Sequence, residues 1–454
     1  MIRSQFLRPA FLLALASLGA AGCDRSTDGL RPFPLSTDPV VFGDTFGAGV
    51  DFQAFLGSKV DAVSIDTAER QSGTASMKVT VPPAGAVGGT YAGGAFVANI
   101  ARDLSGYDAL TFWAKASRAI TFDVAGLGND NTGTSRFEAS RSAIALTTTW
   151  TKFVIPIPLA ARLAAERGLF FMAEGPEGGL GADVWFDEVR FERTGTITNP
   201  RPAMSSRTLT SFVGGTVSPS GTQTIFNVSG SDVTVGHMSG YFDFSSTNPA
   251  VATTLAGTIR VIGPGVAQVT ASLGGVAATG TVTINAIAPP STPAPAPTLP
   301  AGDVISLFSN TYANVAVDTW SATWDAADVT DLQIGSDDIK GYTNLVFAGI
   351  EFTTNTIDAT AMTHFHLDVL IPSGMTFRVK LVDFGANGVF GGGDDAEDEL
   401  EFQAGTTPPL TAGTWSPLDI PLADFTGLTT RAHLAQLVLS GTSTAFIDNV
   451  YLHR

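Results

Sequence analysis

Polar side chains that could bind a ligand alternate with apolar ones around His366. His364, His366 and Asp368 share one face of a predicted strand, and large apolar residues share the other. In the following segment Arg378 and Lys380 alternate with apolar residues in the same way. If the apolar rows fill a core, the polar rows form a sheet face with the donors and acceptors that sugar hydroxyls need. The alternatives are a solvated or loop-covered face and, for the His-x-His pair alone, a metal site.

Aromatic residues supply a flat apolar surface on which a pyranose ring can stack. Trp113 and Lys115 would project from one face of a predicted strand, with Asp123 on the next strand. We expect these three residues to form a second ligand surface. Three further aromatic residues stand in or near predicted loops, where exposing a large ring is unfavourable unless it is used: Trp320, Trp324 and Tyr342. They are candidate sugar platforms, or they close the end of a β-sandwich.

The chain repeats one strand pattern, at Val184–Arg193 and at Ala445–Arg454. Each copy holds one acidic residue flanked by apolar ones, Asp187 and Asp448, and each follows a Trp-containing strand that ends in Ile-Pro. The repetition predicts two copies of one β-module.

Alternation places Asp187 on the same face as Trp185, Val189 and Phe191. An unpaired carboxylate in such apolar surroundings is destabilising. Asp187 therefore needs a partner, which is either a cation or local backbone amides.

A glycine-rich acidic loop follows the Arg378 strand. Its oxygen-bearing side chains are closely spaced: Asp383, Asn387, Asp394 and Asp395. Oxygen ligands separated by glycines that permit tight turns are typical of calcium loops. The order is not that of an EF-hand, and a solvated acidic loop is the alternative.

Composition points to an all-β chain. With 454 residues the chain is long enough for about three domains, and its 49 glycines and 25 prolines favour strands and turns over helices. The formal net charge of −17 argues against nucleic acid as a partner. The single cysteine excludes an internal disulfide.

At the N-terminus Arg3 and Arg8 precede the apolar run Phe11–Leu18, and small residues lead directly to Cys23. This segment resembles a bacterial lipoprotein signal peptide. The resemblance implies that residues 1–22 are removed and that Cys23 is lipidated, which tethers the chain to a membrane through acyl chains. We expect a cell-envelope protein, in the outer membrane or at the cell surface rather than in the inner membrane. An ordinary secretory signal is the alternative.

The rest of the chain divides by composition. The predicted segments are a tether at 23–40, module one at 41–193, module two at 203–286, a proline-rich linker at 287–302 and module three at 303–454. The linker should be a stiff, polyproline-like spacer with nothing to bury.

Module two resembles the bacterial Ig-like group 2 (Big2) family through Phe244–Ala252, Gly257–Ile259 and Gly263–Ala271. Phe244 stands where the family usually has tryptophan, which leaves the predicted core intact. The resemblance implies an Ig-like β-sandwich, a fold that often serves as a spacer.

Modules one and three resemble jelly-roll carbohydrate-binding modules. In module one the resemblance rests on Leu104–Lys115, the Trp150 strand and Phe186–Val189. Module three resembles modules attached to family 16 glycoside hydrolases, through Tyr342–Leu345, Gly349–Phe352, His364–Asp368 and Asp448–Tyr451. The predicted fold is therefore all-β, with two jelly-roll sandwiches flanking an Ig-like one.

The jelly-roll resemblance also implies a structural calcium ion that bridges the first and last strands of each module. In module one its ligands would be Asp187 and Asp44, and in module three Asp448 would take the same role. Asn310 stands at the position that corresponds to Asp44, which weakens the second site.

The sequence contains no recognisable catalytic motif. The paired-acid strand of family 16 glycosidases, the nucleophile elbow and the phosphate loop are all missing. We therefore expect a non-catalytic, lipid-anchored envelope protein that binds polysaccharide or oligosaccharide and presents it to partner glycan-degrading enzymes or transporters. The alternatives are a structural or adhesion protein whose sandwiches bind proteins or act as spacers, and a glycoside hydrolase-associated enzyme.

Overall fold

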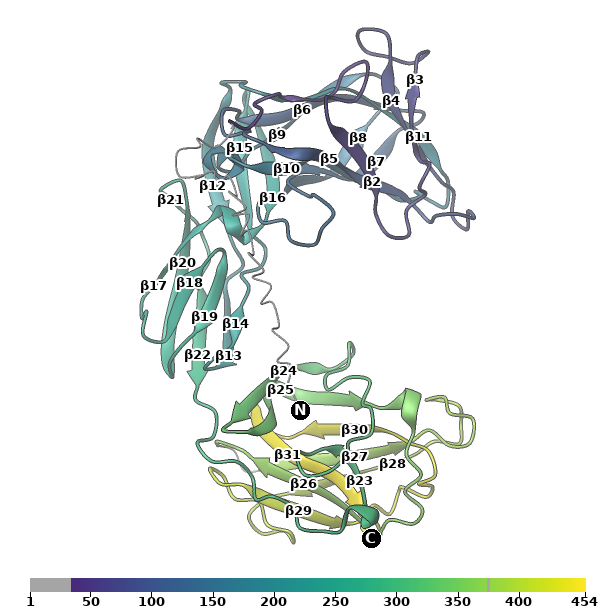
Figure 1. Cartoon of the computed structure of the whole chain (residues 1–454), viewed down its shortest axis with the longest axis vertical. Helices are drawn as coiled ribbons and strands as arrows, with labels where there is room; N and C mark the ends of the chain where they lie inside the picture. Colours follow the sequence, from purple (N-terminus) through teal and green to yellow (C-terminus); the bar gives the residue numbers. More distant parts are fainter. Residues whose placement is uncertain (1–33, 374–375) are drawn as a thin grey trace, which may run out of the picture.

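The computed structural model describes residues 34–373 and 376–454, so the predicted signal peptide and Cys23 lie outside the described residues. The described chain is all-β, as predicted, with one β-sandwich near each end of its long axis and an Ig-like sandwich between them (Figure 1). The helical segments of this part are single 3₁₀ turns: η1 (Ala160–Leu163), η2 (Ser239–Tyr241), η3 (Ala301–Asp303) and η4 (Thr353–Asn355).

Module one is a sandwich of two sheet layers. Its first layer has the order β3-β4-β11-β6-β9, with β1 paired to β11. These strands are β1 (Val40–Phe42), β3 (Val63–Asp66), β4 (Ser76–Val81), β6 (Ala109–Ala116), β9 (Thr151–Pro156) and β11 (Ala182–Glu192). The part of its second layer that belongs to module one consists of β2 (Val50–Ala54), β5 (Ala92–Arg102), β7 (Ile120–Leu127), β8 (Ala139–Leu146) and β10 (Glu166–Glu174).

The second layer continues beyond module one, because β16 (Ser231–His237) pairs with β8. Two more strands extend it, β12 (Ile197–Ala203) and β15 (Gln223–Val228). Tyr241 joins the two modules further, since its buried hydroxyl donates a hydrogen bond to the carbonyl of Phe137 at 2.6 Å. The sheet thus crosses the predicted boundary between modules one and two, and both share one hydrophobic core.

Module two is an Ig-like sandwich of two small sheets. One contains β13 (Arg207–Phe212), β17 (Asp243–Ser246), β20 (Gly265–Leu273), β21 (Val276–Ala277) and β22 (Val282–Ile287), and β13 pairs with β22 in parallel. The other contains β14 (Thr216–Val217), β18 (Ala252–Leu255) and β19 (Thr258–Val261). Membership of the Big2 family stays a prediction.

Module three is one sheet folded into two layers by the long strand β25 (Asp337–Glu351). Residues 340–343 of β25 pair with β31, and residues 347–351 pair with β30, so the strand crosses from one layer to the other. The first layer contains β23 (Val304–Phe308), β24 (Ala326–Ile334), β26 (His364–Leu370), β29 (Ser416–Pro421) and β31 (Thr444–His453). The second layer contains β27 (Phe377–Asp383), β28 (Ala396–Phe402) and β30 (Leu434–Ser440).

Modules one and three repeat the same arrangement. The order β3-β4-β11-β6-β9 in module one corresponds to β24-β25-β31-β26-β29 in module three. The repeated sequence pattern also folds alike, because the residue after each aspartate has a positive φ, 49° at Glu188 and 48° at Asn449. Each is a β-bulge, which shifts the register of the strand by one residue.

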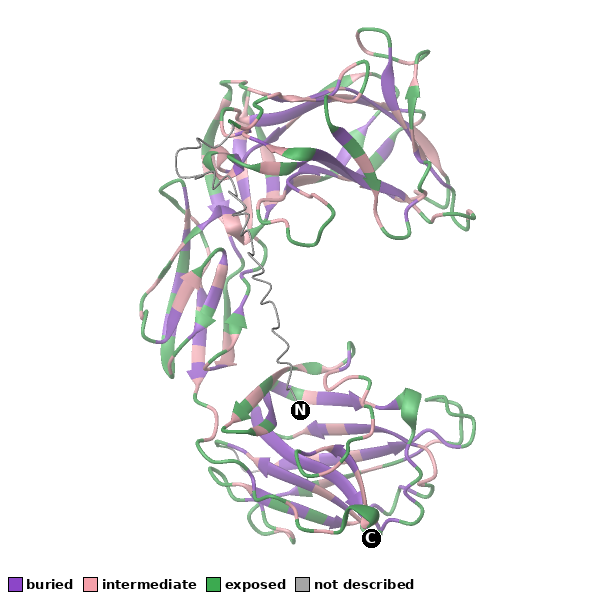
Figure 2. Cartoon of the chain, viewed as in Figure 1, coloured by how far each residue is buried: buried purple, intermediate pink, exposed green. Residues whose placement is uncertain are grey.

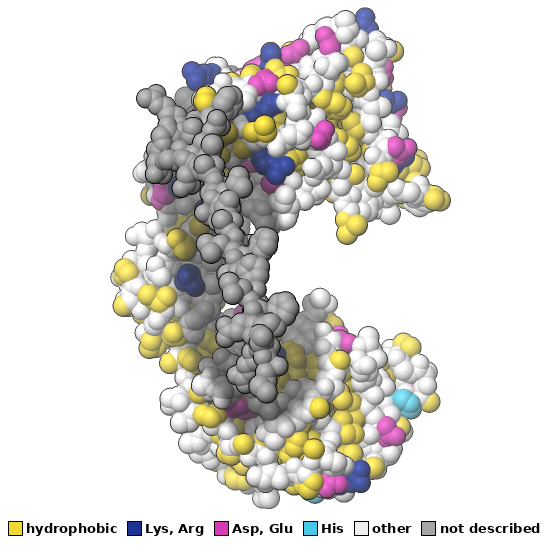
Figure 3. Space-filling view, viewed as in Figure 1, with side chains coloured by type: hydrophobic (Ala, Val, Ile, Leu, Met, Phe, Trp, Pro, Cys, Tyr) yellow, Lys and Arg dark blue, Asp and Glu magenta, His cyan; other side chains and the backbone are white. Residues whose placement is uncertain are grey.

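The core of each sandwich lies between its layers, and buried residues recur along most of the long strands (Figure 2). On the face seen in Figure 3, acidic and basic side chains are scattered singly among apolar and uncharged ones. Among the described residues, none belongs to a helix long and apolar enough to span a membrane.

Candidate ligand-binding faces

The outer face of the second layer of module three carries an exposed tryptophan. Trp324 is 46% exposed, and its indole Nε1–H donates a hydrogen bond to Oε1 of Glu351 at 3.0 Å. The ring stacks on Phe347, with centroids 6.1 Å apart and planes inclined by 21°. Gly349 lies beneath the ring, where any Cβ would overlap it. Glycine therefore makes the room that allows the indole to lie flat on the sheet.

Polar side chains surround this indole on the neighbouring strands. Glu351 also accepts a hydrogen bond from the Gln436 amide at 3.0 Å, which orients both groups. Gly349 pairs with Val438, and Val438 pairs with Lys380, so the backbone of Lys380 stands two strands, about 10 Å, from that of Gly349 beneath the indole. We define the Trp324 face by six residues: Trp324, Glu351, Arg378, Lys380, Gln436 and Val438.

The two cations of the Trp324 face are held by glutamates of β28. Arg378 binds Glu401 through Nε at 2.8 Å and Nη2 at 2.6 Å, and Lys380 binds Glu397 at 2.8 Å. These pairs fix the cations on the outer surface while leaving donors for a ligand. A flat aromatic ring beside oriented amide, carboxylate and cationic groups suits a ligand that has both C–H faces and hydroxyls.

Replacing Gly349 with alanine should weaken ligand binding at the Trp324 face about tenfold. The added methyl group would push the ring of Trp324 away from the sheet and from Glu351, and misplacing a central aromatic anchor removes part of its contribution. Affinity electrophoresis in polysaccharide gels measures the change. Unchanged affinity, with Trp324 fluorescence also unchanged, would contradict the assigned role of this glycine.

The predicted polar face of His364, His366, Asp368, Arg378 and Lys380 is split by the structure. The two histidines and Asp368 lie on β26 in the first layer, whereas Arg378 and Lys380 lie on β27 in the second layer. The prediction that they form one face was wrong, because the connection between β26 and β27 crosses from one side of the sandwich to the other.

Five side chains on the outer face of the first layer of module three form a group that we call the His366 cluster: His364, His366, Asp419, Tyr451 and His453. Oδ1 of Asp419 lies 3.3 Å from Nδ1 of His366 and 2.8 Å from Nε2 of His453. The His366 ring stacks on Tyr451 with centroids 4.5 Å apart, and His364 stacks on His453 at 5.0 Å. These groups satisfy one another, so the cluster is a packed surface rather than an open polar row.

The proline-rich linker covers this same face. Residues 295–299 line a cavity of about 330 Å³ together with the His366 cluster and Asp368, and Asp368 is only 3% exposed. The linker therefore lies against module three and buries Ala294, while most of its other residues stay exposed.

Of the remaining aromatic candidates in module three, Trp320 and Tyr342 close the end of the sandwich. Tyr342 is fully buried, its hydroxyl donates to the carbonyl of Trp320 at 2.8 Å, and burial raises its pKa. The Trp320 ring packs edge-on against Phe308, and Nζ of Lys340 lies 5.1 Å from its centroid. Neither ring is available as a platform in the way that Trp324 is.

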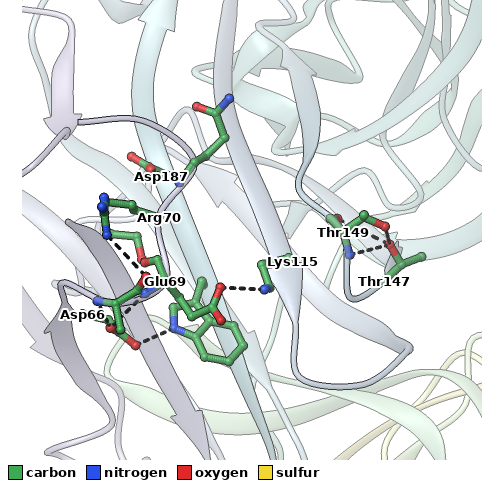
Figure 4. A network of polar contacts seen from close by, with 11 residues as sticks. Asp66, Glu69, Arg70, Lys115, Thr147, Thr149 and Asp187 are labelled. Atoms are coloured by element: carbon green, nitrogen blue, oxygen red, sulfur yellow. Dashed lines mark hydrogen bonds and ion pairs between the residues drawn. The ribbon is translucent and has the colours of Figure 1, made fainter. Parts of the chain in front are cut away.

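In module one, Trp113 and Lys115 lie on the outer face of the first layer, since the alternating residues Phe112 and Ala114 face the core. Figure 4 shows Lys115 pointing toward Glu69 of the loop 66–72. Nζ of Lys115 binds Glu69 of this loop at 2.8 Å and lies 5.2 Å from the Trp185 ring centroid. Trp185 is only 8% exposed and donates its Nε1–H to Asp66 at 2.9 Å. The loop therefore engages the cation, while Trp113 keeps a half-buried ring.

Asp123 does not join Trp113 and Lys115. It lies on β7 in the second layer, whereas β6 is in the first, so the predicted grouping was wrong for the same reason as in module three. Asp123 instead accepts a hydrogen bond from the amide of Gly175 and donates its own amide to Oε2 of Glu174. Glu174 is 1% exposed, and burial, with a further contribution from Asp123, raises its pKa to about 7.

The Glu174 carboxyl should make folding stability depend on pH. Its folded pKa exceeds the ordinary value of 4.5, so the folded protein holds this proton longer and stability falls as pH rises from about 4.5 through about 7. Glu174→Gln replaces the titrating carboxyl with a neutral amide and should therefore remove this pH-dependent loss of stability. We expect the variant to exceed the parent protein by about 2 kcal/mol in unfolding free energy at about pH 8 and to match it at about pH 4. Urea melts across this range measure it, and a constant difference at all pH values would contradict the assignment.

Asp187 lies on the outer face, not with Val189 and Phe191 as the alternation predicted. The bulge at Glu188 turns Val189 and Phe191 into the core and leaves Trp185 and Asp187 outside. Asp187 is nevertheless buried, and its Oδ2 accepts the amides of the covering loop, from Gln71 at 2.7 Å and Ser72 at 3.0 Å.

Asp44 binds the same loop. Its Oδ1 accepts hydrogen bonds from the amides of Thr74 and Ala75, which lower its pKa. Oδ1 of Asp187 accepts the amide of Glu188 at 2.8 Å. Backbone amides therefore partner both carboxylates, and calcium binding in module one stays a prediction.

Asp448 of module three has different partners. Its Oδ1 accepts the amide of Asn449 at 2.6 Å, but its buried Oδ2 has no hydrogen-bond partner. Burial and the neighbouring Asp337 raise its pKa. Asn310, predicted to be the weaker counterpart of Asp44, is bonded to Asp338. In residues 34–373 and 376–454, no three His, Cys, Asp or Glu side chains are grouped to hold a metal, so calcium here stays a prediction.

The acidic loop after β27 is held by internal bonds. Asp383 is fully buried and accepts hydrogen bonds from the amides of Gly385 at 2.9 Å and His433 at 2.7 Å. Asn387 bonds Asp394, and Asp395 accepts the amide of Gly391 at 2.6 Å. Asp383 thus anchors the loop, and calcium binding by the outer residues stays a prediction.

Sequence reasoning missed three members of the Trp324 face, Glu351, Gln436 and Val438. The segment Gly349–Phe352 did carry a signal, because a glycine two residues before a glutamate on one strand face leaves room for a ring beside an acceptor. Gln436 carried none, because it follows Glu351 by 85 residues and its position depends on strand pairing.

Comparisons with known proteins give weak similarities. No family model matches the sequence, and no curated protein matches it. Among solved structures, a family 30 carbohydrate-binding module shares 15% identity over 35% of this chain and 85% of that chain, with a TM-score of 0.24. The family 11 module from Clostridium thermocellum shares 14% identity over 33% of this chain and 95% of that chain, with a TM-score of 0.24.

Two further similarities span more of the chain. The N-terminal CBM22-1-CBM22-2 tandem domain of Xyn10C from Paenibacillus barcinonensis shares 9% identity over 92% of this chain and 98% of that chain, with a TM-score of 0.22. A β-1,2-glucanase from Parabacteroides distasonis shares 10% identity over 56% of this chain and 39% of that chain, with a TM-score of 0.23. Similarity at this level carries no argument about ligand or activity, which must rest on the geometry of the faces.

Proposed function

We propose that this protein binds polysaccharide or oligosaccharide without catalysis, and that the Trp324 face of module three is its binding surface. The observation that carries the proposal is the exposed Trp324 ring, held flat over Gly349 and oriented by Glu351. Of the predicted platforms in module three, it is the one whose ring is exposed and oriented by a fixed partner. Sugar rings would stack on the indole while Gln436, Glu351 and the two cations bind hydroxyls.

The cellular setting is part of the same proposal. Lipidation at Cys23 would hold the protein in the cell envelope, in the outer membrane or at the cell surface. Of the predicted tether, residues 36–40 are hydrogen-bonded to module one, so the tethering role would fall to the residues before them. The bound glycan would then be presented to partner glycan-degrading enzymes or transporters. Trp113 could provide a second, weaker platform in module one, and linked sites raise avidity when both reach one polymer.

A structural or adhesive role is the second candidate. The observation that favours it is that the first-layer faces of both jelly rolls are covered by the chain's own segments, the loop 66–72 and the linker. In that case the sandwiches would serve as spacers or would bind proteins.

Affinity electrophoresis on a panel of soluble polysaccharides, with pulldown on insoluble ones, decides between the two. We expect retardation of the intact protein by at least one glycan and no release of reducing sugar. If a protein that melts cooperatively binds no glycan of a broad panel, the structural role is favoured. Release of reducing sugar would refute the non-catalytic part of the proposal.

A further inference from the structure

The linker segment 291–299 is an extended chain that can accept hydrogen bonds but can donate few. Prolines alternate with small residues at Pro293, Pro295 and Pro297, and proline has no N–H. A surface that binds such a segment must therefore offer donors to its carbonyls.

The outer face of the first layer of module three offers such donors. The indole Nε1–H of Trp415 donates to the carbonyl of Thr292 at 2.9 Å, and the side-chain amide of Asn449 donates to that of Pro295 at 3.3 Å. The hydroxyl of Tyr312 donates to the carbonyl of Leu299 at 3.0 Å. The carbonyls that accept these bonds are three and four residues apart, a spacing that suits a polyproline II helix with its three residues per turn.

The donors are also held in place by contacts within module three. Oδ1 of Asn449 accepts the hydroxyl of Ser309 at 2.9 Å, and its amide also donates to Asp368 at 2.9 Å. Tyr312 packs edge-on against Tyr451, which stacks on His366. An aromatic-lined groove with fixed donors is the arrangement by which proteins recognise polyproline segments.

Module one has no counterpart to this groove. The aspartate before the bulge pairs with a different residue in each module. Asp187 pairs with Trp113 in module one, and Asp448 pairs with Asp368 in module three. Glu188 replaces Asn449, so the bulge there offers a carboxylate rather than an amide donor. The donor groove therefore belongs to module three alone, although the two sheets have the same order.

We propose that the outer face of the first layer of module three is a docking groove for a proline-rich extended segment, and that its resident ligand is the chain's own linker. The groove lies on the layer opposite the Trp324 face, so this docking is independent of carbohydrate binding. Because the linker is covalently attached at an effective concentration of about 1 mM, even a weak groove stays occupied.

The test uses a peptide of residues 288–302 and the full chain in which residues 291–299 are replaced by a Gly/Ser sequence of equal length. We expect the peptide to bind the Gly/Ser variant with a Kd of about 0.1 mM and to bind the parent chain about tenfold more weakly, because the attached linker competes for the groove there. Tyr312→Phe in the Gly/Ser variant should weaken binding about fivefold. A peptide with its prolines changed to alanine is the matched control and should bind more weakly.

A second measurement covers the case in which the Gly/Ser variant does not fold. Hydrogen exchange at the Trp415 indole N–H, identified with Trp415→Phe, should be protected in the parent chain by its bond to Thr292. Exchange at the rate of a free indole would overturn the proposal. So would a folded Gly/Ser variant that does not bind the peptide, or equal peptide binding by the variant and the parent.

Discussion

Trp324→Ala is expected to weaken polysaccharide binding by about 30-fold. The ring is the exposed aromatic anchor of the Trp324 face, and removing a central aromatic anchor lowers binding free energy by about 2 kcal/mol or more. Folding should change little, because Trp324 lies outside the core of module three. Affinity electrophoresis gives the change in Kd, and the thermal melt reports stability.

Two variants control this experiment. Trp324→Phe keeps a ring over Gly349 but loses the donor to Glu351, so it should retain part of the affinity. Trp415→Phe changes a tryptophan of the opposite layer and should leave glycan binding intact. If Trp324→Ala binds as tightly as the parent protein, the site lies elsewhere and Trp113 becomes the next residue to replace.

Asp187→Ala is expected to destabilise modules one and two by about 3 kcal/mol. The buried carboxylate accepts three backbone amides, from Gln71, Ser72 and Glu188, and the alanine variant leaves all of them without this partner. Each unsatisfied buried donor costs about 1 kcal/mol or more. Calorimetry should show the first transition lowered by about 10 °C.

Asp187→Asn is the matched control, since its amide oxygen can still accept some of these bonds and the loss should be about half as large. Melting temperatures measured with calcium and with chelator distinguish the two roles of Asp187, which are capping of backbone amides and binding of a cation. Equal melting temperatures support amide capping. A calcium-dependent rise that disappears in Asp187→Ala would show that the carboxylate binds a cation and would overturn the hydrogen-bond account.

The sequence predicted the class of fold and its repetition because those depend on local patterns. Alternating apolar residues and the repeated Trp, Ile-Pro and Asp signals recur in both modules, and each aspartate occupies the same bulge. Alternation failed at that bulge, because one inserted residue with positive φ reverses which face each later side chain takes. Asn449 is of a residue type that adopts positive φ readily, but Glu188 carries no such signal.

The predicted binding faces failed for a different reason. Strands adjacent in sequence, such as β26 and β27, lie in opposite layers, and nothing in their composition distinguishes this crossing from a hairpin. Arg378 and Trp324 were both predicted as ligand residues, yet their shared face depends on β30 lying between β25 and β27. Such long-range pairing decides which candidates meet.

The pairing of β16 with β8 has a mechanical consequence for a tethered protein. A load between the envelope and a polymer held by module three would pass through this shared sheet, because it ties module two to module one by backbone hydrogen bonds. The buried hydroxyl of Tyr241 reinforces the same junction. Modules one and two would therefore resist extension as one unit, whereas module three is joined to module two by side-chain packing such as that of Phe212 on Phe446.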